Sequence, residues 1–356
     1  MPLISIPEFS NPFPVRASRH REAIRAANPQ WLHRQGLVRG DAALQRYTAM
    51  LIEDWASETF AACEDRRTSL LLANWWSFIG LYDDIMDDGP LGWDHPSHLA
   101  FHAELTGVLN ERNHTPHHGP QDRTASLSPL GAAFDDLLGR TLPLMLPALR
   151  TRFVTAVGDY ITASVRETEH RSANSVPDSE TYMALRRTSG GIGVCFRLLE
   201  LSEGIALPQP FLDSWLCHDL HTALIDQMSL LNDVISLEKE LAHGDTHNLV
   251  ILIHREQGCS WQEAADTVAR QANACTKDFQ EYLLRLEADL LPGRPHSCDR
   301  AALVRYARGL QNMHTAHLKY SLHSGRFTDY EDTRPGAPRT SADSCSPRAI
   351  ELPETD

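Results

Sequence analysis

Apolar residues recur at three- and four-residue spacing along most of the chain between positions 40 and 325. The series within residues 41–82 is Leu44, Tyr47, Leu51, Trp55 and Phe60, and similar spacing returns at 131–170, 180–202, 209–242, 260–290 and 299–324. This period matches one face of an α-helix. No run of alternating β-branched residues predicts a strand. The pattern therefore predicts an all-α fold.

Two stretches depart from the helical pattern. Residues 112–129 are polar and read as a loop, and residues 331–356 have the composition of a disordered tail. No internal repeat and no charged linker divides the rest of the chain. We therefore expect one helical domain over residues 1–330, opened by a proline-rich N-terminal strap.

Composition and charge exclude several kinds of binding partner and location for this protein. At 356 residues and 42% hydrophobic content the chain can bury a large core, and a net charge of −14 argues against a nucleic-acid partner, because basic surfaces hold phosphate backbones. Seven cysteines with no C-x-x-C pair indicate a reducing compartment, so we expect a cytoplasmic protein without structural zinc. No stretch of about 18 uncharged apolar residues predicts stable membrane insertion, and residues 1–20 lack the apolar centre of an export signal.

The first candidate site is LYDDIMDDGP, residues 81–90, which places four aspartates beside an apolar run. On a helix Asp83 and Asp87 share a face, and such a pair repels itself unless a cation lies between the carboxylates. Oxygen ligands suit a hard ion such as Mg²⁺. The alternative is a solvated acidic helix end. A calcium loop starting at Asp84 is excluded, because Met86 and His95 stand at its third and twelfth positions.

The second candidate site is LLNDVISLEKEL, residues 230–241. Asn232, Ser236 and Glu240 follow each other at four-residue steps, so their oxygens lie along one stripe of a helix. The neighbouring residues are apolar, and a polar stripe within an apolar helix needs a partner. The alternative is a surface helix. If the stripe is buried, it forms a second oxygen ligand set for a hard cation.

Together the two motifs resemble those of class I terpene synthases (terpene cyclases) of the bacterial type. The aspartate-rich DDxxD motif and the (N/D)DxxSxxxE motif of that family match, in order, Asp83, Asp84, Asp87, Asn232, Asp233, Ser236 and Glu240. Lys239 stands at the basic position that often precedes the glutamate, and GDTHNLV at 244–250 resembles the stretch that follows it. The resemblance implies a single-domain helical bundle around a central apolar cavity.

Two further segments extend the resemblance over roughly residues 5–327. YMALRRTSGG resembles the helix-break segment, in which Arg186 has the family's spacing to the second motif and would sense diphosphate, with Ser189 as the linker and Gly190 as the effector residue. Arg326 matches the arginine of the closing Arg-Tyr pair. Phe327 departs from the pair and lacks the phenolic group of the family's tyrosine.

The resemblance also implies a cofactor, roles and an activity. Asp83 and Asp87 would hold two Mg²⁺ ions, and Asn232, Ser236 and Glu240 would hold a third. The side chains that would donate hydrogen bonds to the diphosphate are those of Arg186, Lys239 and Arg326, with Asp84 orienting Arg326 or a neighbouring residue instead of binding metal directly. The enzyme would ionise a linear prenyl diphosphate and cyclise the carbocation. Family members often pair as loose dimers, so a homodimer is expected.

Substrate length depends on the residues that line the cavity. Those expected there, by helical register with Asp83 or by position in the family, are Trp76, Ile79, Gly80, Cys195, Met313 and Tyr320. Several of them stand where relatives carry larger aromatic residues. The smaller lining favours the twenty-carbon geranylgeranyl diphosphate over the fifteen-carbon farnesyl diphosphate that is commoner in the family. The alternative is that side chains of other helices refill the space.

Rival functions make different predictions. A chain-elongating prenyl diphosphate synthase would carry a second DDxxD motif, where this chain has Asn232 and Ser236. A protein that binds diphosphate without turnover would keep the motifs, and a non-catalytic acidic helical interaction protein would bind no ligand in a Mg²⁺-dependent way.

Overall fold

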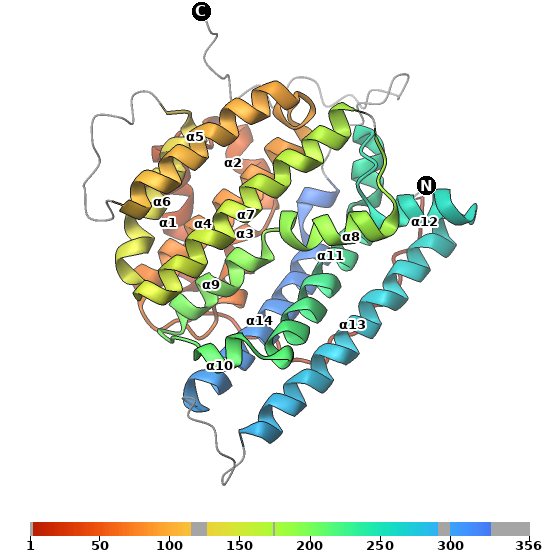
Figure 1. Ribbon diagram of the computed structural model, residues 1–356. Helices are drawn as coiled ribbons and strands as arrows, with labels where there is room; N and C mark the ends of the chain where they lie inside the picture. Colours follow the sequence, from red (N-terminus) through yellow and green to blue (C-terminus); the bar gives the residue numbers. More distant parts are fainter. Residues whose placement is uncertain (1–2, 115–126, 174, 291–299, 329–356) are drawn as a thin grey trace, which may run out of the picture.

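The computed structural model describes residues 3–114, 127–173, 175–290 and 300–328. All regular secondary structure in these ranges is helical (Figure 1). The predicted all-α class is therefore confirmed. Most of the expected loop at 112–129 and the whole expected tail at 331–356 lie outside the described residues.

The helices, in chain order, are α1 (Arg21–Arg34), α2 (Gly40–Ala49), α3 (Ile52–Thr59), α4 (Arg66–Asp88), η1 (Pro90–Trp93), α5 (His95–His114), α6 (Pro129–Thr141), η3 (Leu142–Leu144), α7 (Pro147–Ser172), α8 (Ser179–Ser189), α9 (Ile192–Ser202), α10 (Gln209–Leu212), α11 (Trp215–His243), α12 (Leu249–Gln257), α13 (Trp261–Asp289), α14 (Arg300–His323) and η4 (Gly325–Phe327). None of the helices in the described ranges combines the length and apolar content needed to cross a bilayer.

The apolar pattern over residues 41–82 is divided among three helices. Leu51 adopts a left-handed backbone with φ of 58°, which turns the chain between α2 and α3. A second turn precedes α4, where the Asp65 side chain accepts a hydrogen bond from the Thr68 backbone N–H at 2.7 Å. These breaks give α3 a direction of its own, and that direction carries Trp55 to the cavity described below.

Helix α5 shows why hydropathy alone missed some helices. Its buried stripe runs through Phe101, Leu105 and Leu109 but also includes His98 and Arg112. Because two of the buried positions carry polar residues, the three- and four-residue spacing of apolar residues is interrupted and the sequence pattern does not indicate a helix. Helices α1 and α12 were likewise not predicted.

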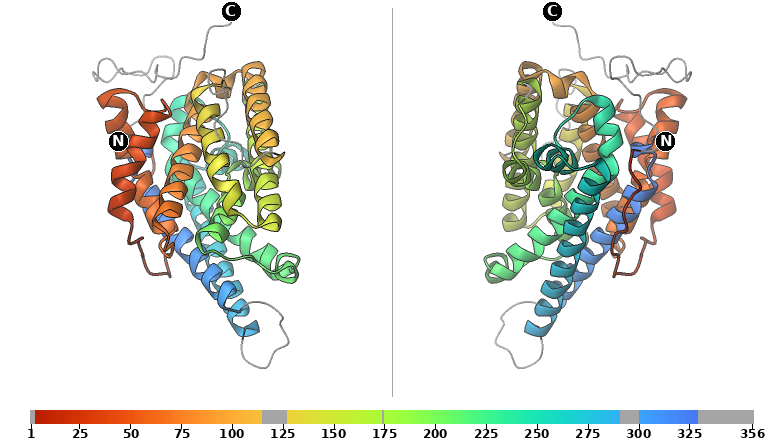
Figure 2. Two further views of the ribbon diagram at one scale, coloured as in Figure 1. Left: turned by 90° about the vertical axis from the view of Figure 1, so that its left-hand side faces the viewer. Right: turned by 90° about the vertical axis from the view of Figure 1, so that its right-hand side faces the viewer.

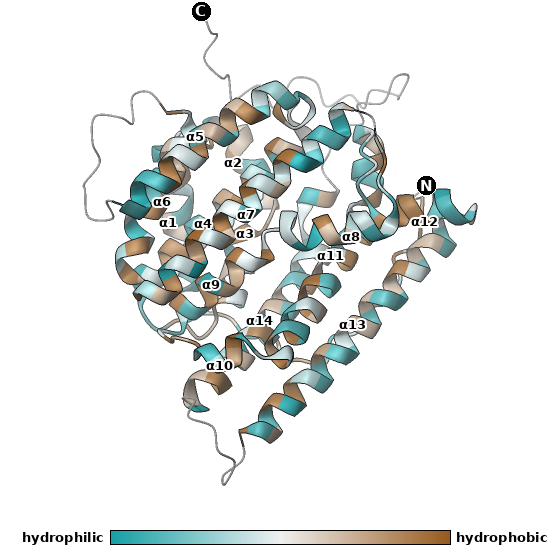
Figure 3. Ribbon diagram, in the orientation of Figure 1, coloured by the Kyte–Doolittle hydropathy of each residue, from teal (hydrophilic) through white to brown (hydrophobic). Residues whose placement is uncertain are grey.

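Helix α11 packs on α13 and α14, and α14 packs on α3 (Figures 1 and 2). Helices α5, α6 and α7 cover one side, and α13 lies along α11 on the other. Most of the core is one cluster of buried apolar residues, and a smaller cluster between α11, α12 and α13 includes Leu237, Val250 and Ala265. Hydrophobic and hydrophilic residues alternate along outer helices such as α13, as an amphipathic helix requires (Figure 3).

The N-terminal segment lies along α13. The backbone N–H groups of Ser5 and Ser10 donate hydrogen bonds to Gln262 at 2.8 Å and Asn273 at 2.7 Å. Its Phe13 ring meets Phe279 edge-on, with the ring centroids 5.6 Å apart. The segment therefore fastens α13 against the bundle.

Candidate active site

A cavity with about 690 Å³ of empty space, part of it open to solvent, lies among α3, α4, α8, α9, α11, α14 and η4. Its lining comprises Trp55, Trp76, Ile79, Gly80, Asp83, Arg186, Gly190, Ile192, Cys195, Met228, Ser229, Asn232, His317, Tyr320 and Arg326. One aspartate of the first motif and the asparagine of the second thus border the same apolar chamber.

The aspartates of the first motif lie in the last turn of α4 and contact a cation from the far end of the described chain. Arg326, carried by η4, donates from Nη2 to Asp83 Oδ2 and from Nε to Asp84 Oδ1, each at 2.6 Å. The Lys239 ammonium lies 3.5 Å from the same Asp84 oxygen. Asp84 therefore orients the two cations that were expected to bind diphosphate.

Asp83 and Asp87 differ in their ionisation. Burial raises the pKa of Asp83, but Arg326 and Arg186 outweigh it and hold that pKa below the usual range. Burial and the neighbouring Asp83 carboxylate raise the pKa of Asp87 to about 7. Two carboxylates on one helix face thus repel each other, as their spacing predicted.

The second motif lies on α11, where hydrogen bonds hold each of its expected ligands. Arg186 Nη2 donates to Asn232 Oδ1 at 2.6 Å, and the Ser236 hydroxyl donates to the Asn232 carbonyl at 2.7 Å. Asn248 Nδ2 donates to Glu240 Oε2 at 2.7 Å. Burial, followed by two nearby carboxylates, raises the pKa of Glu240 to about 8.

Asp233, inside the second motif, links three helices. The Tyr182 hydroxyl donates to the Asp233 carboxylate, whose two oxygens lie 2.9 and 2.8 Å away, and the Leu249 backbone N–H donates to it at 2.8 Å. These contacts connect α8, α11 and the start of α12. Asp233 thereby fixes the position of Arg186, one turn after Tyr182.

The chain breaks between α8 and α9 at the glycines singled out from the sequence. Gly191 has φ of 68°, and a Cβ built there would lie 3.1 Å from the Tyr160 ring. A larger residue would meet both backbone strain and a clash. Gly190 borders the cavity, and the Ser189 hydroxyl donates to Glu167 on α7.

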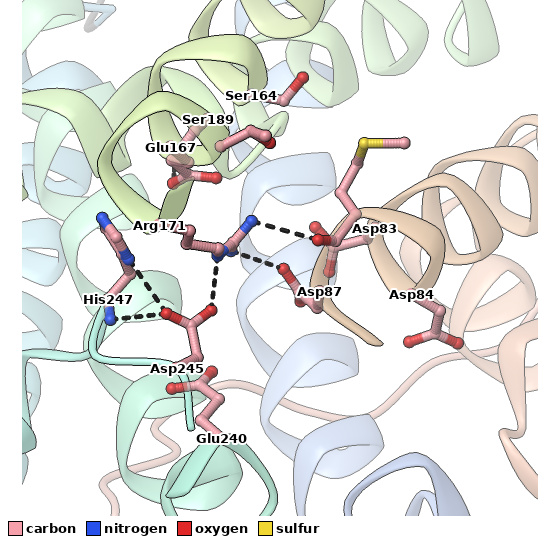
Figure 4. A network of polar contacts seen from close by, with 12 residues as sticks. Asp83, Asp84, Asp87, Ser164, Glu167, Arg171, Ser189, Glu240, Asp245 and His247 are labelled. Carbon is pink, nitrogen blue, oxygen red and sulfur yellow. Dashed lines mark hydrogen bonds and ion pairs between the residues drawn. The ribbon is translucent and has the colours of Figure 1, made fainter. Parts of the chain in front are cut away.

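A buried bridge that sequence reasoning missed joins the two motif regions. Arg171 of α7 donates to Asp87 at 3.0 Å and to Asp245 at 2.8 Å, and Figure 4 shows it lying between them. Asp245 also accepts from the His247 backbone N–H at 2.9 Å. The signal was partly present, because Asp245 belongs to the GDTHNLV stretch that resembles the family.

Five of the six residues expected to line the cavity do so, and Met313 does not. Its side chain is completely buried in the core. Trp55 and His317 line the cavity and were missed. The Trp55 ring stacks on Tyr320 at a centroid distance of 4.1 Å, and Ile52 fills the space beside Gly80, where a Cβ would lie 3.0 Å from its Cδ1. Helix α3 therefore refills part of the room that the small side chains leave.

The donor set fits a hard cation. Its atoms are carboxylate, amide and hydroxyl oxygens, and burial together with neighbouring carboxylates raises the pKa values of Asp87 and Glu240, so a cation at either motif would relieve an unfavourable charge. In the described ranges, no group of three or more His, Cys, Asp or Glu side chains lies close enough together to hold a metal ion by itself. A cation held here would take its other ligands from water and from a bound anion.

The comparisons with known proteins agree with this site. The model of "Terpene synthase family 2, C-terminal metal binding" matches residues 74–278. A (−)-δ-cadinene synthase of Streptomyces clavuligerus is 31% identical over 79% of this chain and 80% of its own. A (+)-T-muurolol synthase of Roseiflexus castenholzii, named as cyclising (2E,6E)-farnesyl diphosphate, is 29% identical over 89% and 92%.

A solved structure agrees in fold. Germacradien-4-ol synthase from Streptomyces citricolor superposes with a TM-score of 0.76 at 25% identity, covering 89% of this chain and 98% of that one. The match of the family model extends over more than half of the sequence and includes both acidic motifs. The chain therefore belongs to terpene synthase family 2.

Proposed function

We propose that this terpene synthase converts farnesyl diphosphate, with three Mg²⁺ ions, into a cyclic sesquiterpene and diphosphate. One observation carries the proposal. Asp83, Asn232, Arg186 and Arg326 border the polar part of a single cavity whose remaining lining is mostly apolar and aromatic. A prenyl diphosphate has the matching shape, an apolar chain joined to a multiply charged anion.

The basic residues supply the diphosphate site. Arg186, Lys239 and Arg326 contact Asn232, Asp84 and Asp83 through side-chain groups that suit phosphate oxygens equally well. We infer that diphosphate takes over part of these contacts and releases Asp83 and Asn232 oxygens. Mg²⁺ ions held by Asp83, Asp87, Asn232, Ser236 and Glu240 would neutralise the charge that develops on the leaving oxygens.

The apolar part of the cavity handles the carbocation. Trp55, Trp76 and Tyr320 present aromatic rings, and an aromatic face stabilises a cation by about 0.5–2 kcal/mol. Gly190, at the break between α8 and α9, also lines the cavity, so we infer that a backbone group there faces the substrate. Enclosure by these groups keeps bulk water away from the cation.

We propose the fifteen-carbon substrate in place of the twenty-carbon one that the small residues favoured. Ile52 and Trp55 occupy the space beside Gly80 and Tyr320. The relatives named above for δ-cadinene and T-muurolol also make sesquiterpenes, and one is named for farnesyl diphosphate. Both observations point to the shorter chain.

The test is to incubate the purified protein with geranyl, farnesyl or geranylgeranyl diphosphate, with and without Mg²⁺, and to analyse the extract by mass spectrometry. A cyclic fifteen-carbon product that requires Mg²⁺ supports the proposal. A longer diphosphate would indicate chain elongation, a cyclic twenty-carbon product would restore the longer substrate, and no turnover would leave a binding protein.

The number of ions, the cytoplasmic location and the homodimer stay predictions. Soaking crystals with Mn²⁺ and inorganic diphosphate counts the ions by anomalous scattering. Sedimentation velocity measures the oligomeric state, and cell fractionation of the source organism tests the location.

A further inference from the structure

Four aromatic rings form one wall of the cavity, and each carries a buried polar atom. These residues, the polar wall, are Trp55, Trp76, His317 and Tyr320. Trp55 contacts the other three, with ring centroids 5.6 Å from Trp76, 5.6 Å from His317 and 4.1 Å from Tyr320. The wall is therefore one continuous surface contributed by α3, α4 and α14.

The polar atoms of this wall make no hydrogen bond to any part of the chain that the structure describes. They are the indole nitrogens of Trp55 and Trp76, the His317 Nδ1 atom and the Tyr320 hydroxyl. Buried polar groups without partners are rare and costly, and they concentrate where a ligand or an ordered water completes the bonding. A water molecule can both donate and accept hydrogen bonds, and a buried water typically makes two to four of them with polar groups of the protein.

His317 differs from the other members because it is a base. Burial, His314 and the cations Arg186 and Arg326 lower its pKa to about 3, so the imidazole is neutral and keeps a lone pair. Of the other oxygens on the cavity lining, Asp83 is paired with Arg326 and Asn232 with Arg186, while the unpartnered Ser229 hydroxyl is a far weaker base than a neutral imidazole. His317 is therefore the side chain of the described cavity lining that is best suited to accept a proton.

We propose that the polar wall holds a water molecule that ends the reaction and that His317 takes the proton of this water, so that the product is a terpene alcohol. This inference rests on the proposed function. A lone pair of the water oxygen forms the C–O bond to the cationic carbon. The resulting oxonium loses a proton to a His317 ring nitrogen, and the electrons of the broken O–H bond stay on the alcohol oxygen. The imidazolium returns its proton to solvent or diphosphate when the site opens.

The first experiment identifies the source of oxygen. The wild-type enzyme is incubated with farnesyl diphosphate and Mg²⁺ in H₂¹⁸O, and products and diphosphate are measured together. We expect a cyclic alcohol whose mass increases by one ¹⁸O. Release of diphosphate with only hydrocarbon products overturns the inference and leaves the proposed function standing. Absence of diphosphate release and of any product overturns both.

The second experiment tests His317 itself with two variants. His317→Leu removes the base, and His317→Asn keeps a hydrogen-bonding group of lower basicity, so at least one should fold even if an apolar residue packs poorly. We expect the ratio of alcohol to hydrocarbon to fall by about tenfold or more in each folded variant, because general-base catalysis contributes at least that much. Diphosphate release is measured in parallel, so that the alcohol fraction is compared only among variants that still ionise the substrate.

Two histidines of the same helix serve as controls. His314 is buried one turn before His317 but packs on Phe279 and does not line the cavity, and His323 is exposed. His314→Leu reports general damage to α14, and His323→Leu reports loss of an imidazole at the surface. An unchanged alcohol fraction in a folded His317 variant, or an equal fall in the His314 variant, overturns the role of His317.

Discussion

Replacing Trp55 with leucine tests whether α3 sets the length of the substrate. The indole stacks on Tyr320 at 4.1 Å and meets Trp76 edge-on at 5.6 Å, so it forms the centre of the cavity wall. Leucine keeps an apolar surface but leaves a gap where the indole lies against Trp76 and Tyr320. The change therefore enlarges the chamber without touching the acidic motifs.

The structure sets three magnitudes for this variant. Three aromatic pairs, with Trp76, His317 and Tyr320, are lost at about 0.5–1.5 kcal/mol each, so the free energy of unfolding should fall by about 1.5–4.5 kcal/mol. One cation–π contact of about 0.5–2 kcal/mol is also lost, which slows turnover of farnesyl diphosphate by about 2- to 30-fold. Added room favours the longer chain, and the selectivity for geranylgeranyl over farnesyl diphosphate should rise about tenfold or more.

The assay measures kcat/KM for diphosphate release with both substrates and follows unfolding in urea. Trp215→Leu is the control, because Trp215 is an exposed tryptophan that packs on Tyr282 outside the cavity. The control should keep wild-type selectivity. If Trp55→Leu loses stability as expected and its preference between the two substrates does not change, the reasoning about the cavity wall is refuted.

Three further predictions concern the site and its support. Asn232→Ala should slow diphosphate release by about 100-fold or more, because it removes an expected metal ligand and the acceptor of Arg186, whereas Asp226→Ala on the same helix should not. Arg171→Leu should lower the free energy of unfolding by about 3–5 kcal/mol, since it leaves the buried Asp245 carboxylate without its arginine and Asp87 with Arg326 only at 3.7 Å. Burial lowers the pKa of His98 to about 4 in the folded protein, below its value of about 6.5 in the unfolded chain. Protonation therefore favours the unfolded chain as the pH falls below 6.5, and the free energy of unfolding of wild type should decrease by about 2 kcal/mol more than that of His98→Gln between pH 7 and pH 5.

For each of these three predictions, one experimental result would contradict it. Turnover of Asn232→Ala near that of the Asp226 control would refute the second ligand set. A loss below about 1 kcal/mol in urea denaturation of Arg171→Leu would show that its ion pairs do not hold the motifs together. Parallel pH dependence of unfolding in wild type and His98→Gln would show that this histidine titrates normally in the folded protein.

The parts of the site that lie on one helix were readable from the sequence. Asp83 and Asp87 share a face of α4, and Asn232, Ser236 and Glu240 follow α11, because the helical period alone converts spacing into direction. The break at Gly190 and Gly191 was equally local. The resemblance to the terpene synthases then put these local features in order.

The parts that join distant segments were not readable in this way. Arg171 pairs with Asp87 and Asp245 across 84 and 74 residues, and no spacing rule applies over such separations. Trp55 was recognised as a core residue of a helical pattern, but the turn at Leu51 decides where α3 points. Met313 shows the opposite case, since it satisfies the pattern and yet packs away from the cavity.

The sequence by itself determined the helical class, the positions of the two oxygen-rich motifs and the chemical type of ligand they suit. These follow from local geometry, which each helix carries within its own period. Only the tertiary structure decided that Arg326 also reaches Asp83, that Arg171 bridges the motifs, and that Trp55 and His317 complete the cavity wall. Such neighbours depend on how all the helices pack into one dense core, and close packing is a property of the whole set of side chains and not of any single segment.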